Sequence, residues 1–362
     1  MSSMVDWELA AVTGRRLVRP GPATSLDEAA AAVAELRVAA ERAEEPVRAL
    51  TRMHSDAPPK PVRVVDRLDW IDVNCAGMSA VLSPLVERLQ ERQDKAPGPL
   101  ALALGSRATG VQAGAVLAFV AARVLGQYDV FGPSGGQLLL VAPNIVEAER
   151  RMDVNPSDFR LWVCLHEVTH RLQFTAVPWL AEYMRAQIGE FVEATDLDPD
   201  VLRDRLQTLL KGVVSSVRGS GAEAGDAAGE GILALVQNPE QRAVLDRLTA
   251  MMSLVEGHAE YVMDEVGPAV VPSVATIRRR FSKRREGTSP LDRLLRRLLG
   301  LDQKMKQYAD GRRFVSGVVA EVGMDGFNAV WAAPDTLPRK DELAAPEDWV
   351  RRVHGRPHAI NA

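Results

Sequence analysis

The sequence predicts a mainly helical protein with a small β element, a fold of the α+β class. Apolar residues recur at helical spacing over most of the chain, and several of these stretches follow a recognisable helix start. Residues 135–143 are the clearest strand candidate. No change in composition divides the 362 residues, so we expect an N-terminal helical segment at 1–60 and a main domain at 61–362, with one continuous domain as the alternative.

The first part of the chain is expected to form three helices. One has a capping box at 25–28 and continues through alanine-rich sequence toward Pro46. After an extended proline-rich linker at 57–61, a second helix covers about residues 70–93. A third covers the glycine-bearing apolar stretch 108–122, which is shorter than the roughly 20 residues needed to span a bilayer. We therefore expect these glycines to allow close helix packing, and we expect no membrane partner.

The most informative segment is His166-Glu167-Val168-Thr169-His170, an H-E-x-x-H pattern inside a buried helix that starts at Asn155. An α-helix turns about 100° per residue, so residues four apart share one face and two imidazoles there can bind one ion. Glu167 projects from a different side, where it can act as general base on a water activated by the metal. Two buried histidines without such a shared partner would lose hydrogen bonding, which favours a zinc site over ordinary core residues.

A catalytic zinc site needs a third protein ligand. The candidates are Glu256 and His258, in a second long helix that follows Asn238. They project about 160° apart by the helical period, so only one of them can reach the metal, and periodicity does not choose between them. Glu260, four residues after Glu256, could hold the second ring nitrogen of a ligand histidine. This favours Glu256 as ligand with Glu260 in support, and it leaves His258 as an oxyanion donor or a surface residue.

These motifs carry a resemblance to a known family. H-E-x-x-H followed on a later helix by Glu256-Gly257-His258-Ala259-Glu260 resembles the gluzincin branch of the zinc metallopeptidases, in which a glutamate is the third ligand and an acidic residue supports a ligand histidine. More specifically, the chain is similar to the actinobacterial zincin-like metallopeptidases, whose members carry a general hydrolase label or an association with deazaflavin coenzyme biosynthesis. The likeness covers most of the chain and includes the segments 64–74, 124–129, 166–180, 256–260, 299–308 and 331–338.

The resemblance implies a zincin-like fold built around an H-E-x-x-H active-site helix. It also implies an edge strand that lines the cleft above this helix and binds the substrate backbone by strand addition. Residues 135–143 are the candidate for that strand, with an ordinary core strand as the alternative.

The overall composition agrees with a cytoplasmic enzyme. A formal net charge of −4 argues against general affinity for nucleic acid, and the two cysteines, Cys75 and Cys164, argue against a disulfide scaffold. The N-terminus has neither a basic start nor an apolar run, so no signal peptide is expected. Two segments keep alternative interpretations. The glycine-rich loop 218–231 is a lid over the cleft or a bare linker, and the basic segment 278–313 is a nucleic-acid patch or, as we favour, an amphipathic helix with a solvated face.

The sequence therefore predicts a zinc-dependent metallohydrolase, most simply a peptidase that acts on a peptide or protein substrate. His166, His170 and Glu256 are the expected zinc ligands, and Glu167 is the expected general base. Two alternatives stay open: a non-catalytic protein that uses the zinc scaffold for binding or regulation, and a hydrolase of a non-peptide amide. The presence of a general base favours an enzyme, because a structural metal has no need of one.

Overall fold

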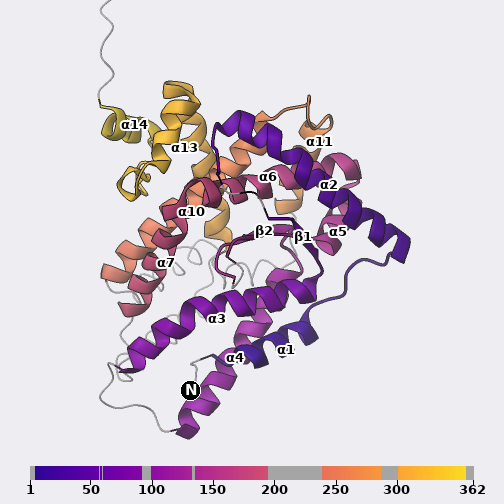
Figure 1. The fold of residues 1–362 in the computed structure, drawn as a ribbon, viewed down its shortest axis with the longest axis vertical. Coiled ribbons are helices and arrows are strands. Elements are labelled where there is room, and N and C mark those ends of the chain that lie inside the picture. The colour runs from indigo at the N-terminus through magenta and orange to yellow at the C-terminus, as the bar shows by residue number, and fades with distance from the viewer. Residues whose placement is uncertain are drawn as a thin grey trace, which may run out of the picture.

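The computed structural model describes residues 5–56, 58, 60–91, 99–132, 135–194, 239–286 and 301–355. Within these ranges the chain is mostly helical, with one three-stranded sheet (Figure 1), which confirms the predicted fold class. The strands are β1 (Arg63–Val65), β2 (Gly126–Asp129) and β3 (Gln137–Val141). The helices are α1 (Trp7–Leu17), α2 (Leu26–Thr51), α3 (Arg67–Glu91), α4 (Pro99–Ala121), α5 (Ala142–Met152), α6 (Pro156–Ala176), α7 (Pro178–Glu193), α10 (Pro239–Glu265), α11 (Val274–Glu286), α13 (Leu301–Phe327) and α14 (Pro346–His354), with 3-10 turns η1 (Asn328–Trp331) and η2 (Pro334–Thr336).

The sheet has the strand order β1-β3-β2, so β3 is central and β2 lies at an edge. β1 pairs parallel with β3, with Arg63 opposite Leu139, and β2 pairs antiparallel, with Gly126 opposite Leu140. The expectation that residues 135–143 form an edge strand along the cleft is therefore wrong. β3 is the ordinary core strand of the alternative, because it is paired on both sides. The edge beside the cleft belongs to β2.

Successive side chains of β3 point to opposite faces of the sheet and join two hydrophobic cores. Leu138 and Leu140 belong to the main core, together with residues of α2, α5, α6, α10 and α13. Leu139 and Val141 belong to a smaller core with α1, α3 and α4. In Figure 1 these three helices lie together on one side of the sheet, and α2 and α6 lie on the other. The sheet thus separates the two layers of helices.

Helices α1 and α4 pack with their backbones in close approach. Gly114 of α4 faces the backbone of α1 so closely that a Cβ on this residue would overlap the carbonyl oxygen of Ala10. Gly110 and Gly114 therefore allow close packing, as the sequence predicted. Among the helices that the structure describes, none combines the length and the apolar character needed to cross a membrane.

Helix α2 starts as predicted but ends later. Ser25 accepts a hydrogen bond from the backbone N–H of Glu28, and the Glu28 side chain completes the capping box. The helix continues through Pro46 and ends at Thr51 instead of stopping at the proline. A proline removes one backbone donor but keeps a helical φ, so it is tolerated where packing compensates. Val47, the next residue, is fully buried in the main core.

Helix α2 lies along the back of α6, the helix that carries the H-E-x-x-H segment. Arg160 of α6 pairs with Glu35 of α2, and Arg171 of α6 pairs with Glu44 of α2. Both arginines are buried. Ion pairs therefore join the two helices near both ends of their contact, in addition to the apolar core between them.

Helices α10 and α13 cross at a pair of glycines. Gly257 faces the backbone at Gly311, and Gly311 faces the carbonyl oxygen of Ser253, each so closely that a Cβ would overlap the other chain segment. No side chain separates the two helices at this point. The crossing therefore fixes the rotation of α10 next to Glu256.

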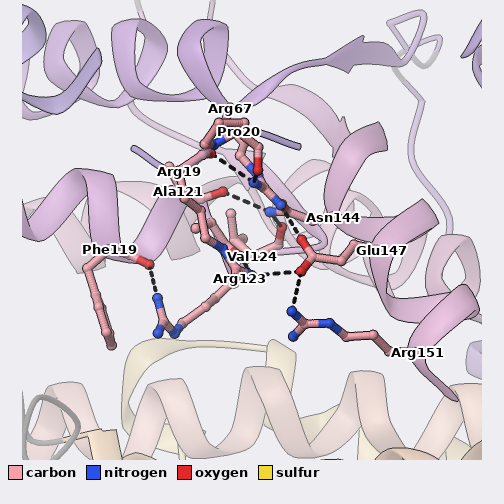
Figure 2. A network of polar contacts seen from close by, with 11 residues as sticks. Arg19, Pro20, Arg67, Phe119, Ala121, Arg123, Val124, Asn144, Glu147 and Arg151 are labelled. Atoms are coloured by element: carbon pink, nitrogen blue, oxygen red, sulfur yellow. Dashed lines mark hydrogen bonds and ion pairs between the residues drawn. The ribbon is translucent and has the colours of Figure 1, made fainter. Parts of the chain in front are cut away.

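A buried polar network holds the turn that leads into β2 (Figure 2). Asn144 of α5 donates hydrogen bonds to the carbonyl oxygens of Ala121 at 2.8 Å and Val124 at 2.5 Å. Arg67 of α3 donates to the Asn144 side-chain oxygen at 2.6 Å and pairs with Glu147 at 2.5 Å. The end of α4 is thus hydrogen-bonded to α5 and, through Asn144, to α3. The network holds the start of β2 in position.

Two of the predicted features lie outside the described residues. They are the glycine-rich loop 218–231 and the leucine-bearing part of the basic segment, residues 291–299. The first part of the basic segment, residues 278–286, belongs to helix α11.

Candidate metal centre

Helix α6 places the two histidines on one face. Asn155 caps the helix by accepting a hydrogen bond from the Asp158 backbone N–H at 3.0 Å, and Pro156 occupies the first turn, as the sequence predicted. His166 and His170 follow one turn apart, with ring centroids 4.6 Å apart. Their Nε2 atoms are 3.0 Å apart. The rings therefore point toward a common position.

Glu256 of α10 completes the cluster. Its Oε2 atom lies 3.5 Å from Nε2 of His166 and 3.6 Å from Nε2 of His170. One ligand atom from each of the three residues lies within 4.8 Å of the others. Two histidines and a glutamate are a donor set found in catalytic zinc sites, which keep a fourth position open. The structure thus brings together the three ligands expected from the sequence.

Gln173 fixes the proton on His170. Its side-chain nitrogen donates to the backbone oxygen of Val255 at 2.9 Å, so its side-chain oxygen is the atom that faces Nδ1 of His170 at 3.0 Å. An amide oxygen only accepts hydrogen bonds, so Nδ1 of His170 carries a proton, and in the neutral ring the lone pair is on Nε2. The second amide N–H points to Nδ1 of His258, 3.1 Å away. Nε2 is therefore the nitrogen that can bind a metal once it has lost its proton.

The charges around this position show that it favours a cation. Burial by itself would lower the pKa of His170, but the nearby Glu256 carboxylate raises it to about 9. Burial would raise the pKa of Glu256, yet the two histidines hold it well below its usual range. The residues therefore fit zinc, which would replace the proton between two nitrogens and a carboxylate.

Glu167 lies beside the cluster with an unused oxygen. The side chain is 6% exposed, and its Oε2 atom is buried without a hydrogen-bond partner in the part of the chain that the structure describes. Burial raises the pKa of Glu167; His166 and His170 oppose this shift, and Glu256 adds to it. A buried carboxylate with a free oxygen is suited to exchange a proton with a reacting group.

Strand β2 touches Glu167 through Gly126. A Cβ on Gly126 would lie 2.5 Å from Cδ and 2.6 Å from Cγ of Glu167, so only glycine allows this approach. The sequence reasoning did not identify Gly126 as a functional residue. In the sequence, only its position within segment 124–129, one of the segments that resemble the family, pointed to Gly126.

Glu260 does not make the supporting contact expected of it. The second ring nitrogen of His170 faces Gln173, and that of His166 has no hydrogen-bond partner among the described residues. Glu260 instead lines the cavity, where its charge raises the pKa of Arg278. Spacing placed Glu260 on the same side as Glu256, but four residues carry it a full turn farther along α10.

His258 is not a surface residue, and it does not line the cavity at the metal centre. It is completely buried, and its ring packs against Phe327 at 5.2 Å and Trp331 at 5.6 Å between centroids. Burial lowers its pKa to about 3, with His170 adding to the effect. A neutral His258 can accept the hydrogen bond from Gln173, so its role is within the core.

The cluster opens into a cavity with a volume of about 680 Å³. Six successive residues, 123–128, line this cavity, and the last three of them belong to β2. Side chains alternate between the faces of a strand, so a run of successive lining residues indicates that the backbone edge of β2 faces the cavity. The metal centre therefore lies beside a strand edge that can pair with an extended chain.

Two histidines and a glutamate around one position, with a buried free carboxylate beside them in an open cavity, define the class of metal-dependent hydrolases. A family model described as zincin-like metallopeptidase matches residues 5–350, and the chain belongs to this family. Zinc is the cofactor of these proteins, and His166, His170 and Glu256 form the cluster that could hold it.

A solved structure is similar over nearly the whole chain. It is the crystal structure of "a putative hydrolase with a novel fold" from Chloroflexus aurantiacus, which is 30% identical in sequence. The alignment covers 97% of this chain and 99% of that chain, with a TM-score of 0.67. No curated protein matches this chain.

Proposed function

We propose that this protein is a zinc-dependent peptidase in which His166, His170 and Glu256 hold the metal and Glu167 is the general base. The observation that carries the proposal is the convergence of the three ligand atoms beside the free oxygen of Glu167. Bound at this position, zinc would polarise the scissile carbonyl and lower the pKa of water toward neutrality.

The protein side chains supply the proton transfers. Glu167 takes the proton from the attacking water and delivers it to the leaving amine. Because burial raises its pKa, the carboxyl group can hold the proton between the two transfers. Gln173 keeps the His170 ring in one tautomer during this exchange, because its side-chain oxygen accepts from Nδ1. A merely structural zinc site would have no use for a buried carboxylate without a partner.

The edge of β2 favours a peptide over a non-peptide amide. An extended peptide that pairs antiparallel with β2 would be bound through backbone groups that every peptide offers. Gly126 lies beside Glu167, so this pairing would carry a peptide bond past the general base.

The first test measures the zinc content of matched variants. We expect about one zinc per chain by elemental analysis in the wild type, and its loss in His166→Ala, His170→Ala and Glu256→Gln. Glu260→Gln is the matched control, since it makes the same change one turn along the same helix and should keep zinc. A wild type without zinc after reconstitution would refute the metal site.

The second test separates metal binding from catalysis. Glu167→Gln should keep zinc and lose cleavage of a mixed peptide library, measured by mass spectrometry, because the amide cannot take a proton. Full cleavage by Glu167→Gln would refute its role as base. Zinc binding without cleavage of any peptide by the wild type would favour the non-catalytic alternative.

A further inference from the structure

The cavity at the metal centre has two ends of different chemistry. Trp162 lies one turn before His166 on α6, and Phe174 lies one turn after His170, and both line the cavity. With a rise of about 1.5 Å per residue, each end is about 6 Å from the nearer histidine, and the two ends are about 18 Å apart. Helix α10 spans the same length, from Met252 to Asp264, which also line the cavity.

The end near Phe174 is apolar. The rings of Tyr128 and Phe174 stack with centroids 5.9 Å apart, and Met184 of α7 and Met252 of α10 line the cavity beside them. Aromatic rings and flexible methionines adapt to large apolar side chains. We call this group the aromatic end.

The end near Trp162 carries two arginines that share one carboxylate. Asp264 of α10 pairs with Arg278 of α11 and, at 3.2 Å, with Arg312 of α13. The Asp264 side chain is 8% exposed, whereas those of Arg278 and Arg312 are 40% and 39% exposed. Each guanidinium has five N–H donors and a carboxylate accepts about four hydrogen bonds, so donors remain for a second acceptor. We call this group the arginine end.

Away from the metal centre, arginines outnumber acids by one among the described residues that line the cavity. Outside the metal ligands and Glu167, the described lining residues include three arginines, Arg123, Arg278 and Arg312, but only two acids, Asp264 and Glu260. Burial lowers the pKa of Arg278 and so does Arg312, while Glu260 raises it. The two neighbouring cations would both be stabilised by a further carboxylate, which guanidinium groups bind in a bidentate manner.

The direction of β2 decides which part of a peptide reaches each end. Gly126 lies beside Glu167, and Tyr128 stacks on Phe174, so β2 runs toward the aromatic end. A peptide paired antiparallel with β2 runs the opposite way, with its C-terminal side toward the arginine end.

We infer that the cavity binds peptides with a large apolar side chain at the aromatic end and a carboxylate at the arginine end. This inference rests on the proposed function and specifies its substrate class. The carboxylate is the free C-terminus or an acidic side chain near it. At about 3.3 Å per residue, an extended peptide covers the distance between the two ends with about five or six residues.

The test uses binding instead of turnover. The zinc-loaded Glu167→Gln variant is titrated by calorimetry with N-acetylated alanine peptides of four to six residues that begin with phenylalanine. Each peptide is made as the free acid, as the carboxamide, and as a carboxamide with glutamate as its last residue. We expect one or both carboxylate forms to bind about tenfold or more tightly than the plain carboxamide. The stronger of the two identifies the source of the carboxylate.

Variants in the same background assign the preference to the arginine end. Arg312→Gln and Arg278→Gln should each reduce the preference for carboxylate peptides. Arg312→Lys keeps the charge but loses the planar guanidinium that binds a carboxylate in a bidentate manner, so it should retain part of the preference. Arg313→Gln is the matched control, because this neighbour is 62% exposed, pairs with Asp310 and does not line the cavity. Folding of each variant is checked by its melting temperature.

The outcomes separate this inference from the proposed function. Equal binding of acid and amide forms, or no binding by any peptide of the set, would overturn the arginine end as a carboxylate site. If the wild type cleaves acid and amide forms equally well, the peptidase proposal stands without the arginine end. If Glu167→Gln shows the preference but the wild type cleaves nothing, the carboxylate site stands and the peptidase proposal fails.

Discussion

Replacing Gly126 with alanine tests whether the approach of β2 sets the position of Glu167. The added Cβ would lie 2.5 Å from Cδ and 2.6 Å from Cγ of Glu167, whereas ordinary contacts of a Cβ begin at 3.4 Å. The strand or the side chain must therefore move by about 1 Å, and a displacement of this size costs about 100-fold in rate when it affects a reacting group. The backbone of Gly126 has no positive φ, so alanine introduces no strain of its own.

The assay compares kcat/KM for a cleaved peptide with zinc content and melting temperature. We expect Gly126→Ala to lose about two orders of magnitude in kcat/KM and to keep its zinc, since the three atoms nearest the new methyl group all belong to Glu167. Gly105→Ala on α4 is the control, because a Cβ there meets nothing within 4 Å. An unchanged kcat/KM in Gly126→Ala would refute the idea that β2 positions Glu167. Loss of zinc would place the effect on the metal ligands instead.

Three further predictions follow from the buried contacts. Gln173→Met should weaken zinc binding by about 10- to 100-fold in competition with a chelator, because the His170 tautomer is no longer fixed; unchanged affinity would contradict this. Without metal, His170 with a pKa of about 9 is protonated at pH 7, so zinc affinity should rise with pH up to about pH 9. Calorimetry in buffers of different protonation enthalpy should show about one proton released at pH 7, and no release would refute the shifted pKa. Gly311→Ala should lower the melting temperature. Overpacking against Ser253 costs about 1–3 kcal/mol or more, which outweighs the roughly 1 kcal/mol gained in helix propensity. An unchanged melting temperature would show that α13 can shift away from α10.

The local features of the metal helix could be predicted from the sequence because they depend on neighbouring residues. The cap at Asn155 and the shared face of His166 and His170 follow from helical geometry alone. Helical geometry also showed that only one of Glu256 and His258 could reach the metal. The choice required the rotation of α10, which is set by its crossing with α13 and is a property of two distant segments.

The features that were missed depend on contacts between distant parts of the chain. Gln173 lies on the histidine face, three residues after His170, but its second partner is the backbone of Val255 on another helix. The identity of the edge strand depends on β1, which pairs parallel with β3 from far upstream and so leaves β2 at the edge. With the sequence Gly-Gln-Tyr-Asp, β2 also lacks the apolar composition by which strands are recognised.

The contact between α2 and α6 makes the metal centre dependent on a helix that contributes none of its ligands. Cys164, on the face of α6 away from the cavity, is fully buried, and its sulfur faces the carbonyl oxygen of Leu36 in α2. Without α2, the buried Arg160 and Arg171 would lose Glu35 and Glu44, and the apolar back of α6 would meet water. Proteolytic removal of the first sixty residues would therefore inactivate the protein, although the remaining chain would still contain every metal-binding residue.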